Sequence, residues 1–199
     1  MRIGAGRWKN AELPKAGPDV RPVPGRLRTS LFSVLLSRIE GATVLDLCAG
    51  IGGFGLEAVS RGAACAVLVD RDRRVAKDLS DWVVARRAEQ EVEVVVADAL
   101  RGGWPPGPYD LVFLDPPFSS WDAGGGATHF LGAAIGAVGP GGLLVVKCPA
   151  RSPVPDDPRW RLVDRREQGS VSYALLQPPA QPGSGAPPCD NADNAGTAR

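Results

Sequence analysis

The sequence predicts an α/β fold in which a mostly parallel, seven-stranded sheet carries helices on both faces. Short apolar runs alternate with amphipathic stretches along residues 26–177, which is typical of strands joined by crossover helices. Four of the runs end in an acidic residue or a glycine-rich segment, as expected where parallel strands finish at one ligand-binding edge. The 199 residues, 44% of them hydrophobic, suffice for one substantial core.

The first predicted elements are an arm and a helix. Residues 1–25 contain several prolines and are predicted to form an extended basic arm. Residues 26–39 carry Leu27, Leu31, Val34 and Leu35 on one helical face. The domain that follows is predicted to span residues 26–177, and the Pro-, Gly- and Ala-rich residues 178–199 are predicted to be a disordered tail.

The remaining elements follow from apolar runs and from helical periodicity. Strands are predicted at residues 43–47, 65–69, 92–96, 111–114, 143–147, 160–165 and 170–176. Helices are predicted at residues 53–61, 73–87 and 128–138. Pro140, Gly141 and Gly142 are expected to form a turn into the fifth strand.

A glycine-rich loop follows the first predicted strand. Gly50, Gly52 and Gly55 have the spacing of a nucleotide-binding turn at the start of a helix. Glycines allow a ligand to approach the backbone closely, and the helix N-terminus presents free N–H groups. Asp70 ends the second strand, in the usual place of an acid that binds a ribose.

The third strand leads to Asp98, and the fourth ends in Asp115, Pro116, Pro117 and Phe118. The last four residues suit methyl transfer to an exocyclic amine, a poor nucleophile because its lone pair is delocalised into the ring. The Asp115 carboxylate and the Pro116 carbonyl offer two acceptors, Pro117 stiffens the turn, and the Phe118 ring can stack on a base. Alone, these residues are better explained as a strand end followed by a rigid turn.

Together, the four loops favour S-adenosylmethionine as cofactor, with S-adenosylhomocysteine as product. Asp70 would bind the ribose hydroxyls, Asp98 the adenine amino group, residues 50–55 the methionine portion, and Asp115 the acceptor amine. A nicotinamide-dependent oxidoreductase would explain the glycine loop and Asp70 but gives no reason for Asp98 or the Pro-Pro turn.

The sequence resembles the bacterial RsmD family of small-subunit (16S) ribosomal RNA guanine-N2 methyltransferases, within the class I S-adenosylmethionine-dependent superfamily. The resemblance rests on residues 1–9, 44–50, 55–58, 60–63, 70–73, 98–99 and 114–118, with Arg21, Pro22 and Arg28. It implies a Rossmann-like class I methyltransferase fold with a closing antiparallel strand. It also implies that the substrate is a guanine of 16S rRNA in the small ribosomal subunit or its precursor.

The predicted site has three groups of residues. The catalytic residues are Asp115, Pro116, Pro117 and Phe118. The cofactor-binding residues are Asp46, Cys48, Ala49, Gly50, Gly52, Gly55, Asp70, Arg71, Asp98 and Ala99. The RNA-binding residues are Arg2, Arg7, Trp8, Lys9, Arg21 and Arg28. The resemblance implies the last group, and charge supports it, because residues 1–38 carry eight basic and two acidic side chains although the whole chain has a net charge of only +1. Without the resemblance, an exposed and solvated extension would explain these residues equally well.

Two other functions remain open. The amine chemistry also fits a DNA or RNA adenine-N6 or cytosine-N4 methyltransferase, although the chain has no room for a separate target-recognition domain. A non-catalytic ribosome-assembly factor is the other alternative, and Ile51, where a Thr or Ser is expected, points that way. Four dispersed cysteines and a single histidine predict no metal site. The sequence shows no signal peptide or membrane span, which predicts a cytoplasmic protein. A monomer is expected for a single compact domain of this size.

Overall fold

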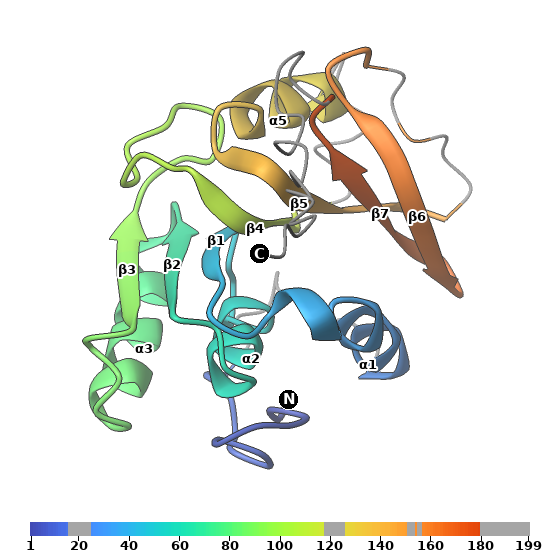
Figure 1. Ribbon diagram of the computed structural model, residues 1–199. Coiled ribbons are helices and arrows are strands. Elements are labelled where there is room, and N and C mark those ends of the chain that lie inside the picture. Colours follow the sequence, from blue (N-terminus) through green and yellow to red (C-terminus); the bar gives the residue numbers. More distant parts are fainter. Residues whose placement is uncertain (16–24, 118–125, 151–153, 155–156, 180–199) are drawn as a thin grey trace, which may run out of the picture.

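The computed structural model describes residues 1–15, 25–117, 126–150, 154 and 157–179. Its strands are β1 Thr43–Leu47, β2 Cys65–Asp70, β3 Val92–Val96, β4 Tyr109–Leu114, β5 Val138–Pro149, β6 Arg161–Gln168 and β7 Val171–Gln177. They form one seven-stranded sheet in the order β3-β2-β1-β4-β5-β7-β6 (Figure 1). β1 to β5 are parallel, and β7 is antiparallel to both of its neighbours. The predicted α/β fold with a closing antiparallel strand is confirmed.

Helices cover both faces of the sheet. The helices are α1 Gly25–Val34, α2 Gly55–Ser60, α3 Arg73–Val84 and α5 Gly126–Ala134, with a short 3-10 helix, η1 Leu36–Arg38. The side chains of α1, α2 and α3 share one hydrophobic core with residues 3 and 13 of the N-terminal segment. α5 lies on the opposite face and contributes Phe130 and Leu131 to a second core (Figure 1). None of the helices described is long and apolar enough to cross a membrane.

The sequence of β1 is apolar at nearly every position because both faces of the strand are covered. Val44 belongs to the core under α1 and α2, whereas Leu45 and Leu47 belong to the core under α5. Because successive side chains of a strand point to opposite faces, a strand covered on both sides must be apolar at nearly every position. Asp46 is the exception, and it lies in the candidate site.

The boundary between α5 and β5 differs from the prediction. The helix ends at Ala134 rather than near residue 138, and β5 already begins at Val138. Pro140, Gly141 and Gly142, predicted as a turn, therefore lie within the strand. Val138 pairs with Tyr109 of β4, and regular pairing resumes only at Leu143 after a shift of register. A segment with almost no side-chain bulk can follow β4 in this irregular way, and glycine composition alone does not distinguish it from a turn.

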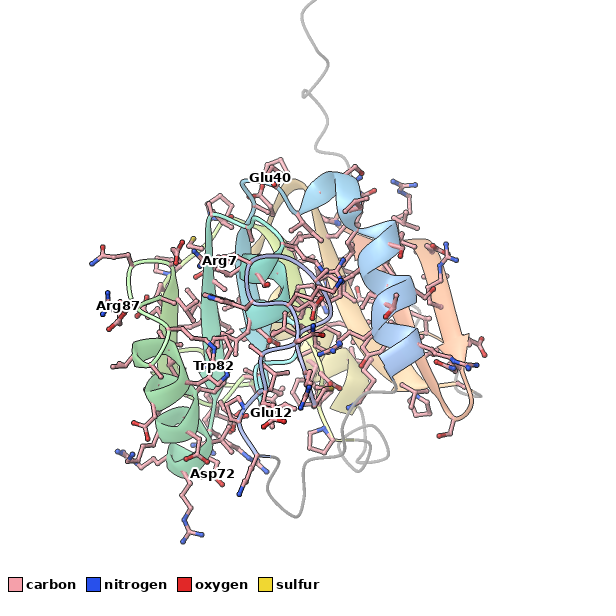
Figure 2. The ribbon with its side chains drawn as sticks, turned by 90° about the horizontal axis from the view of Figure 1, so that it is seen from below. Arg7, Glu12, Glu40, Asp72, Trp82 and Arg87 are labelled. Atoms are coloured by element: carbon pink, nitrogen blue, oxygen red, sulfur yellow. The ribbon has the colours of Figure 1, made fainter. Side chains whose placement is uncertain are left out.

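The N-terminal segment, residues 1–15, is folded rather than extended. Arg2 and Glu12 form an isolated antiparallel bridge, and Ile3 and Leu13 are buried in the core of the α2 face. The indole Nε1 of Trp82, on α3, donates a hydrogen bond of 2.7 Å to the Glu12 carbonyl. Figure 2 shows the segment lying over the helices on this face, with Glu12 next to Trp82. Residues 1–15 of the predicted arm thus complete the hydrophobic core on this face.

Candidate active site

The glycine-rich loop joins β1 to α2 at the carboxyl edge of the sheet. Gly52 has a φ of +74°, a left-handed conformation that favours glycine. A Cβ on Gly55 would lie 2.2 Å from Cδ2 of the buried Leu68 and 3.3 Å from the side chain of Asp46. Glycine at this position therefore lets α2 begin directly against β1 and β2, with its first N–H groups facing the edge where the strands end.

Asp46 supports this loop from beneath. Its side chain is fully buried, and its Oδ2 accepts a hydrogen bond of 2.8 Å from the Gly55 amide. Burial, together with the negative charges of Asp115 and Asp70, raises the pKa of Asp46 well above its ordinary value. Its Oδ1 is buried and has no hydrogen-bond partner among the described residues. A ligand with a hydrogen-bond donor could satisfy this oxygen.

Asp70 links the end of β2 to the loop. Its Oδ2 accepts a hydrogen bond of 2.9 Å from the Gly50 amide, and its Oδ1 accepts one of 3.0 Å from the Asp72 amide. Each carboxylate oxygen has a further lone pair with which to accept a ligand hydroxyl. The Ala49 amide donates to the Val69 carbonyl at 2.9 Å, whereas Arg71 is exposed beside the site.

Asp98 lies just beyond β3. The Ala97 amide donates to the Asp70 carbonyl at 3.1 Å, so the chain leaving β3 stays against the end of β2. Asp98 is half-buried, and its Oδ1 accepts a hydrogen bond of 2.9 Å from the Leu100 amide. Ala99 is buried in the core on the α5 side. The structure thus brings Asp98 to the same edge as Asp70.

Asp115 follows β4 at the same edge. Its amide donates to the Leu47 carbonyl at 3.3 Å, which holds the residue beside the end of β1. Pro116 is buried and Pro117 is exposed, while Phe118 lies outside the described residues. Burial raises the pKa of the Asp115 carboxyl, and an ion pair with Lys147 of β5 opposes that rise.

Lys147 was not predicted from the sequence. It ends an apolar run, where a charged residue is the normal sign of a strand reaching solvent. Its side chain is nevertheless only 14% exposed. The signal that could have found it is the register of the two strands, because residues opposite each other in neighbouring parallel strands place their side chains next to each other.

The arrangement suits transfer of a group between a nucleoside ligand and an amine. Asp70 and Asp98 are acceptors at neighbouring strand ends, and the Gly50 amide fixes the glycine-rich loop beside Asp70. Asp115 is a further acceptor on the other side of the loop. No cluster of His, Cys, Asp or Glu that could hold a metal ion occurs in the part of the chain that the structure describes.

Comparison with known proteins decides the family. The family model "Conserved hypothetical protein 95" matches residues 1–177. The "Ribosomal RNA small subunit methyltransferase D" of Escherichia coli K12 is 34% identical over 190 residues, which are 91% of this chain and 91% of that protein. The protein of the same name from Haemophilus influenzae is 30% identical over 89% of this chain and 93% of its own length. The chain belongs to the methyltransferase D family.

Solved structures agree with this assignment. A candidate methyltransferase from Escherichia coli matches with a TM-score of 0.76 at 33% identity, over 91% of this chain and 99% of that one. A candidate methylase from Haemophilus influenzae matches with a TM-score of 0.72 at 29% identity, over 89% and 98% of the two chains. The chain is thus a methyltransferase, as its sequence predicted.

The predicted RNA-binding residues divide into two sets. Arg2, Arg7 and Lys9 are exposed on the N-terminal segment. Arg7 forms an ion pair with Glu91 and lies over the ring of Trp8. Trp8 itself is half-buried, edge-to-face with Trp82. Arg21 lies outside the described residues.

Arg28 is buried rather than presented to solvent. Its guanidinium donates to the Arg2 carbonyl and lies 3.9 Å from Glu57 Oε2. Glu57, on α2, is fully buried and also accepts hydrogen bonds from the amides of Gly4 at 2.7 Å and Ala5 at 3.2 Å and from Arg61 Nε at 2.7 Å. In this structure Arg28 therefore holds the N-terminal segment in place. Sequence reasoning missed the role of Glu57 because its partners are distant along the chain.

Proposed function

We propose that this methyltransferase transfers a methyl group from S-adenosylmethionine to the exocyclic N2 amine of a guanine in small-subunit (16S) ribosomal RNA. The observation that carries the proposal is the buried Asp115 carboxyl group at the end of β4, beside the glycine-rich loop that follows β1. The names of the relatives from Escherichia coli and Haemophilus influenzae support a ribosomal RNA substrate from the small subunit.

The residues at the sheet edge fit S-adenosylmethionine. Asp70 keeps acceptor capacity for the ribose hydroxyls, and Asp98 lies one strand further, where it accepts from the adenine amino group. Asp46, buried beneath the loop, supports the segment that would hold the methionine portion through its hydrogen bond to the Gly55 amide. When bound, the cofactor supplies a methyl group activated by a sulfonium sulfur.

Asp115 prepares the amine for attack. Its carboxylate and the Pro116 carbonyl accept the two N–H groups of N2, which directs the nitrogen lone pair toward the methyl carbon. The lone pair forms the new C–N bond while the electron pair of the C–S bond returns to sulfur. The nitrogen, positively charged at that point, gives one proton to the Asp115 carboxylate and from there to solvent. Asp115 thus supports the charge that develops in the transition state.

The exposed cations of the N-terminal segment extend the site toward RNA. Arg2, Arg7 and Lys9 lie on one short folded segment and are exposed. A Cβ on Gly53 would lie 3.0 Å from Cε of Met1, so the segment reaches the glycine-rich loop itself. Phosphates bound near Met1 and Arg2 would therefore lie next to the cofactor site, whereas Arg7 lies at the far end of α2, where its amide donates to the Ser60 carbonyl.

The test is methylation of small ribosomal subunits that lack the modification. The purified protein is incubated with methyl-labelled S-adenosylmethionine and the subunits, and the RNA is digested to nucleosides for mass spectrometry. Labelled N2-methylguanosine is the expected product. Label in N6-methyladenosine or N4-methylcytidine would overturn the guanine assignment and leave the amine chemistry standing. Cofactor binding without label in any nucleoside would favour a non-catalytic role in ribosome assembly.

A further inference from the structure

The register of the sheet places Lys147 and Asp115 side by side. β4 and β5 pair in parallel with Leu114 opposite Val146, so the next residue of each strand is Asp115 and Lys147. Phe113 and Val145, two positions earlier, both belong to the core on the α1 and α2 side. Alternate residues of a strand share a face. Both charged side chains therefore project to that same face, where they form their ion pair.

The pair is largely shielded from water. The side chains of Lys147 and Asp115 are 14% and 16% exposed. Tyr173 of β7 is opposite Lys147 in the register, is itself buried, and closes the site on that side. Attraction between opposite charges is stronger where solvent screens it little, and a buried ion left without its partner is strongly unfavourable.

Several titratable groups face Asp115 from the elements around it. Cys48 follows β1, and burial with the nearby acids raises its pKa to about 12, so it stays a neutral thiol. Burial with the charges of Asp115 and Asp46 raises the pKa of Tyr173, which is likewise neutral. Asp46 of β1 is also close, since burial and the negative charges of Asp115 and Asp70 raise its pKa. Lys147 is the cation that the described structure pairs with this carboxyl group.

We propose that Lys147 is a positioning residue for methyl transfer: it holds Oδ1 of Asp115, so that Oδ2 faces the target amine as a charged acceptor. The inference rests on the proposed function and adds to it a residue that touches neither substrate nor cofactor. A protonated Asp115 would lose the negative charge that supports the amine and would have no capacity to take its proton. Lys147 opposes that protonation, which burial alone would favour.

The first test is the pH dependence of the rate. Single-turnover methylation is measured with saturating cofactor and subunits for wild type, Lys147→Met and Lys147→Arg. In wild type the rate is expected to rise with pH as Asp115 loses its proton. In Lys147→Met this rising limb of the pH–rate profile is expected to move to higher pH by about one unit or more. The rate of the variant should then be at least about tenfold below that of wild type at pH values under the limb and should recover at pH values above it. Lys147→Arg keeps the charge and should keep most of the rate. An unmoved limb in Lys147→Met would overturn the proposal.

A matched control removes a lysine elsewhere. Lys77 of α3 pairs with Asp81, and both side chains are exposed, at 71% and 63%. Lys77→Met should leave the pH profile unchanged, because an exposed pair does not act on the site. Cofactor affinity, measured by calorimetry, reports whether each variant is folded, and Lys147→Gln replaces the Met variant where that protein is unfolded.

A second measurement needs neither RNA nor cofactor. The carboxyl carbons of aspartate are labelled with 13C, and the Asp115 signal is assigned by its loss in Asp115→Asn. Its titration is expected to move to higher pH in Lys147→Met, and a titration independent of Lys147 would overturn the inference whatever the activity. The two proposals can fail separately. If the wild-type protein methylates no ribosomal RNA but the titration of Asp115 still depends on Lys147, the proposed function is overturned and the coupling of the two residues stands.

Discussion

The carboxylate of Asp70 accepts a hydrogen bond of 2.9 Å from the Gly50 amide, which fastens the glycine-rich loop of β1 to the end of β2. Asp70 thus shapes the loop and, in the proposed complex, binds the ribose as well. A single substitution at this position removes both contributions.

Asp70→Ala is expected to weaken S-adenosylmethionine binding about 10- to 100-fold, because hydrogen bonds to a charged group each contribute about 1.5–3 kcal/mol. Isothermal titration calorimetry measures the change. Asp72→Ala is the control: Asp72 caps α3 through the Arg74 amide at 2.7 Å, so its loss should lower stability and spare cofactor affinity. An unchanged dissociation constant in Asp70→Ala would count against the ribose assignment.

Asp115→Ala should lower kcat by about 100-fold or more, since it removes the acceptor on which charge develops in the transition state. Cofactor affinity should stay near that of wild type. Asp110, at the opposite end of β4, accepts hydrogen bonds from the Thr43 amide at 2.8 Å and from its hydroxyl at 2.9 Å. Asp110→Ala removes a carboxylate from the same strand and should retain kcat. Equal turnover by Asp115→Ala and wild type would exclude the catalytic role.

Glu57→Gln should destabilise the protein by about 3–5 kcal/mol, because it removes the charge that Arg28 and Arg61 share within the protein. Urea unfolding measures the free energy of unfolding. The matched change Glu12→Gln breaks an exposed pair with Arg2 and should cost less than about 1 kcal/mol. Similar losses of unfolding free energy in Glu57→Gln and Glu12→Gln would show that burying Glu57 with its two arginines contributes little to stability.

Gly6→Ala tests the docking of the N-terminal segment. Gly6 has a φ of +80°, and a Cβ there would lie 1.6 Å from the Ser60 carbonyl oxygen. The left-handed conformation and the backbone clash should together cost more than about 2 kcal/mol. Around Gly136 nothing lies within 4 Å of an added Cβ, so Gly136→Ala should be nearly neutral. Limited trypsin digestion would show whether the segment has been released.

Cys48 should resist alkylation. Burial and the nearby carboxylates raise its pKa to about 12, whereas an ordinary thiol has a pKa of about 8.5, so at pH 8 its reactive thiolate is about 2,000-fold scarcer. Iodoacetamide labelling followed by peptide mass spectrometry should find Cys48 unmodified in the folded protein and modified in urea. Rapid labelling of the folded protein at pH 8 would contradict the raised pKa.

The sheet and the glycine-rich loop could be predicted because each depends on residues close in sequence. Val44, Leu45 and Leu47 are apolar on both faces of β1, and Gly52 and Gly55 are glycines for local reasons of conformation and space. The beginning of β5 could not be predicted in this way. There the pairing of Val138 with Tyr109 overrides the turn preference of the glycines that follow.

The residues that sequence reasoning missed depend on distant partners. From the sequence, Lys147 is expected to be an exposed residue near a strand end. Only the pairing of β4 with β5, in which Leu114 is opposite Val146, places Lys147 beside Asp115. From the sequence, Glu57 is indistinguishable from an ordinary helix residue, because its contact with Gly4 is formed only in the folded protein. Arg28 is likewise indistinguishable from a surface cation, because its partner Glu57 is distant along the chain. Charge counted along residues 1–38 gives no indication of which cations the fold buries.

The contacts of the N-terminal segment also set an order of events during synthesis. Gly4 hydrogen-bonds to Glu57, 53 positions later, Glu12 accepts from Trp82, 70 positions later, and Arg7 pairs with Glu91, 84 positions later. A ribosome makes a chain from its N-terminus at about 5–20 residues per second, so the first residues to emerge wait several seconds for their partners. The beginning of this chain therefore reaches its final place only after Glu91 has been made, while β4 to β7 are still to come.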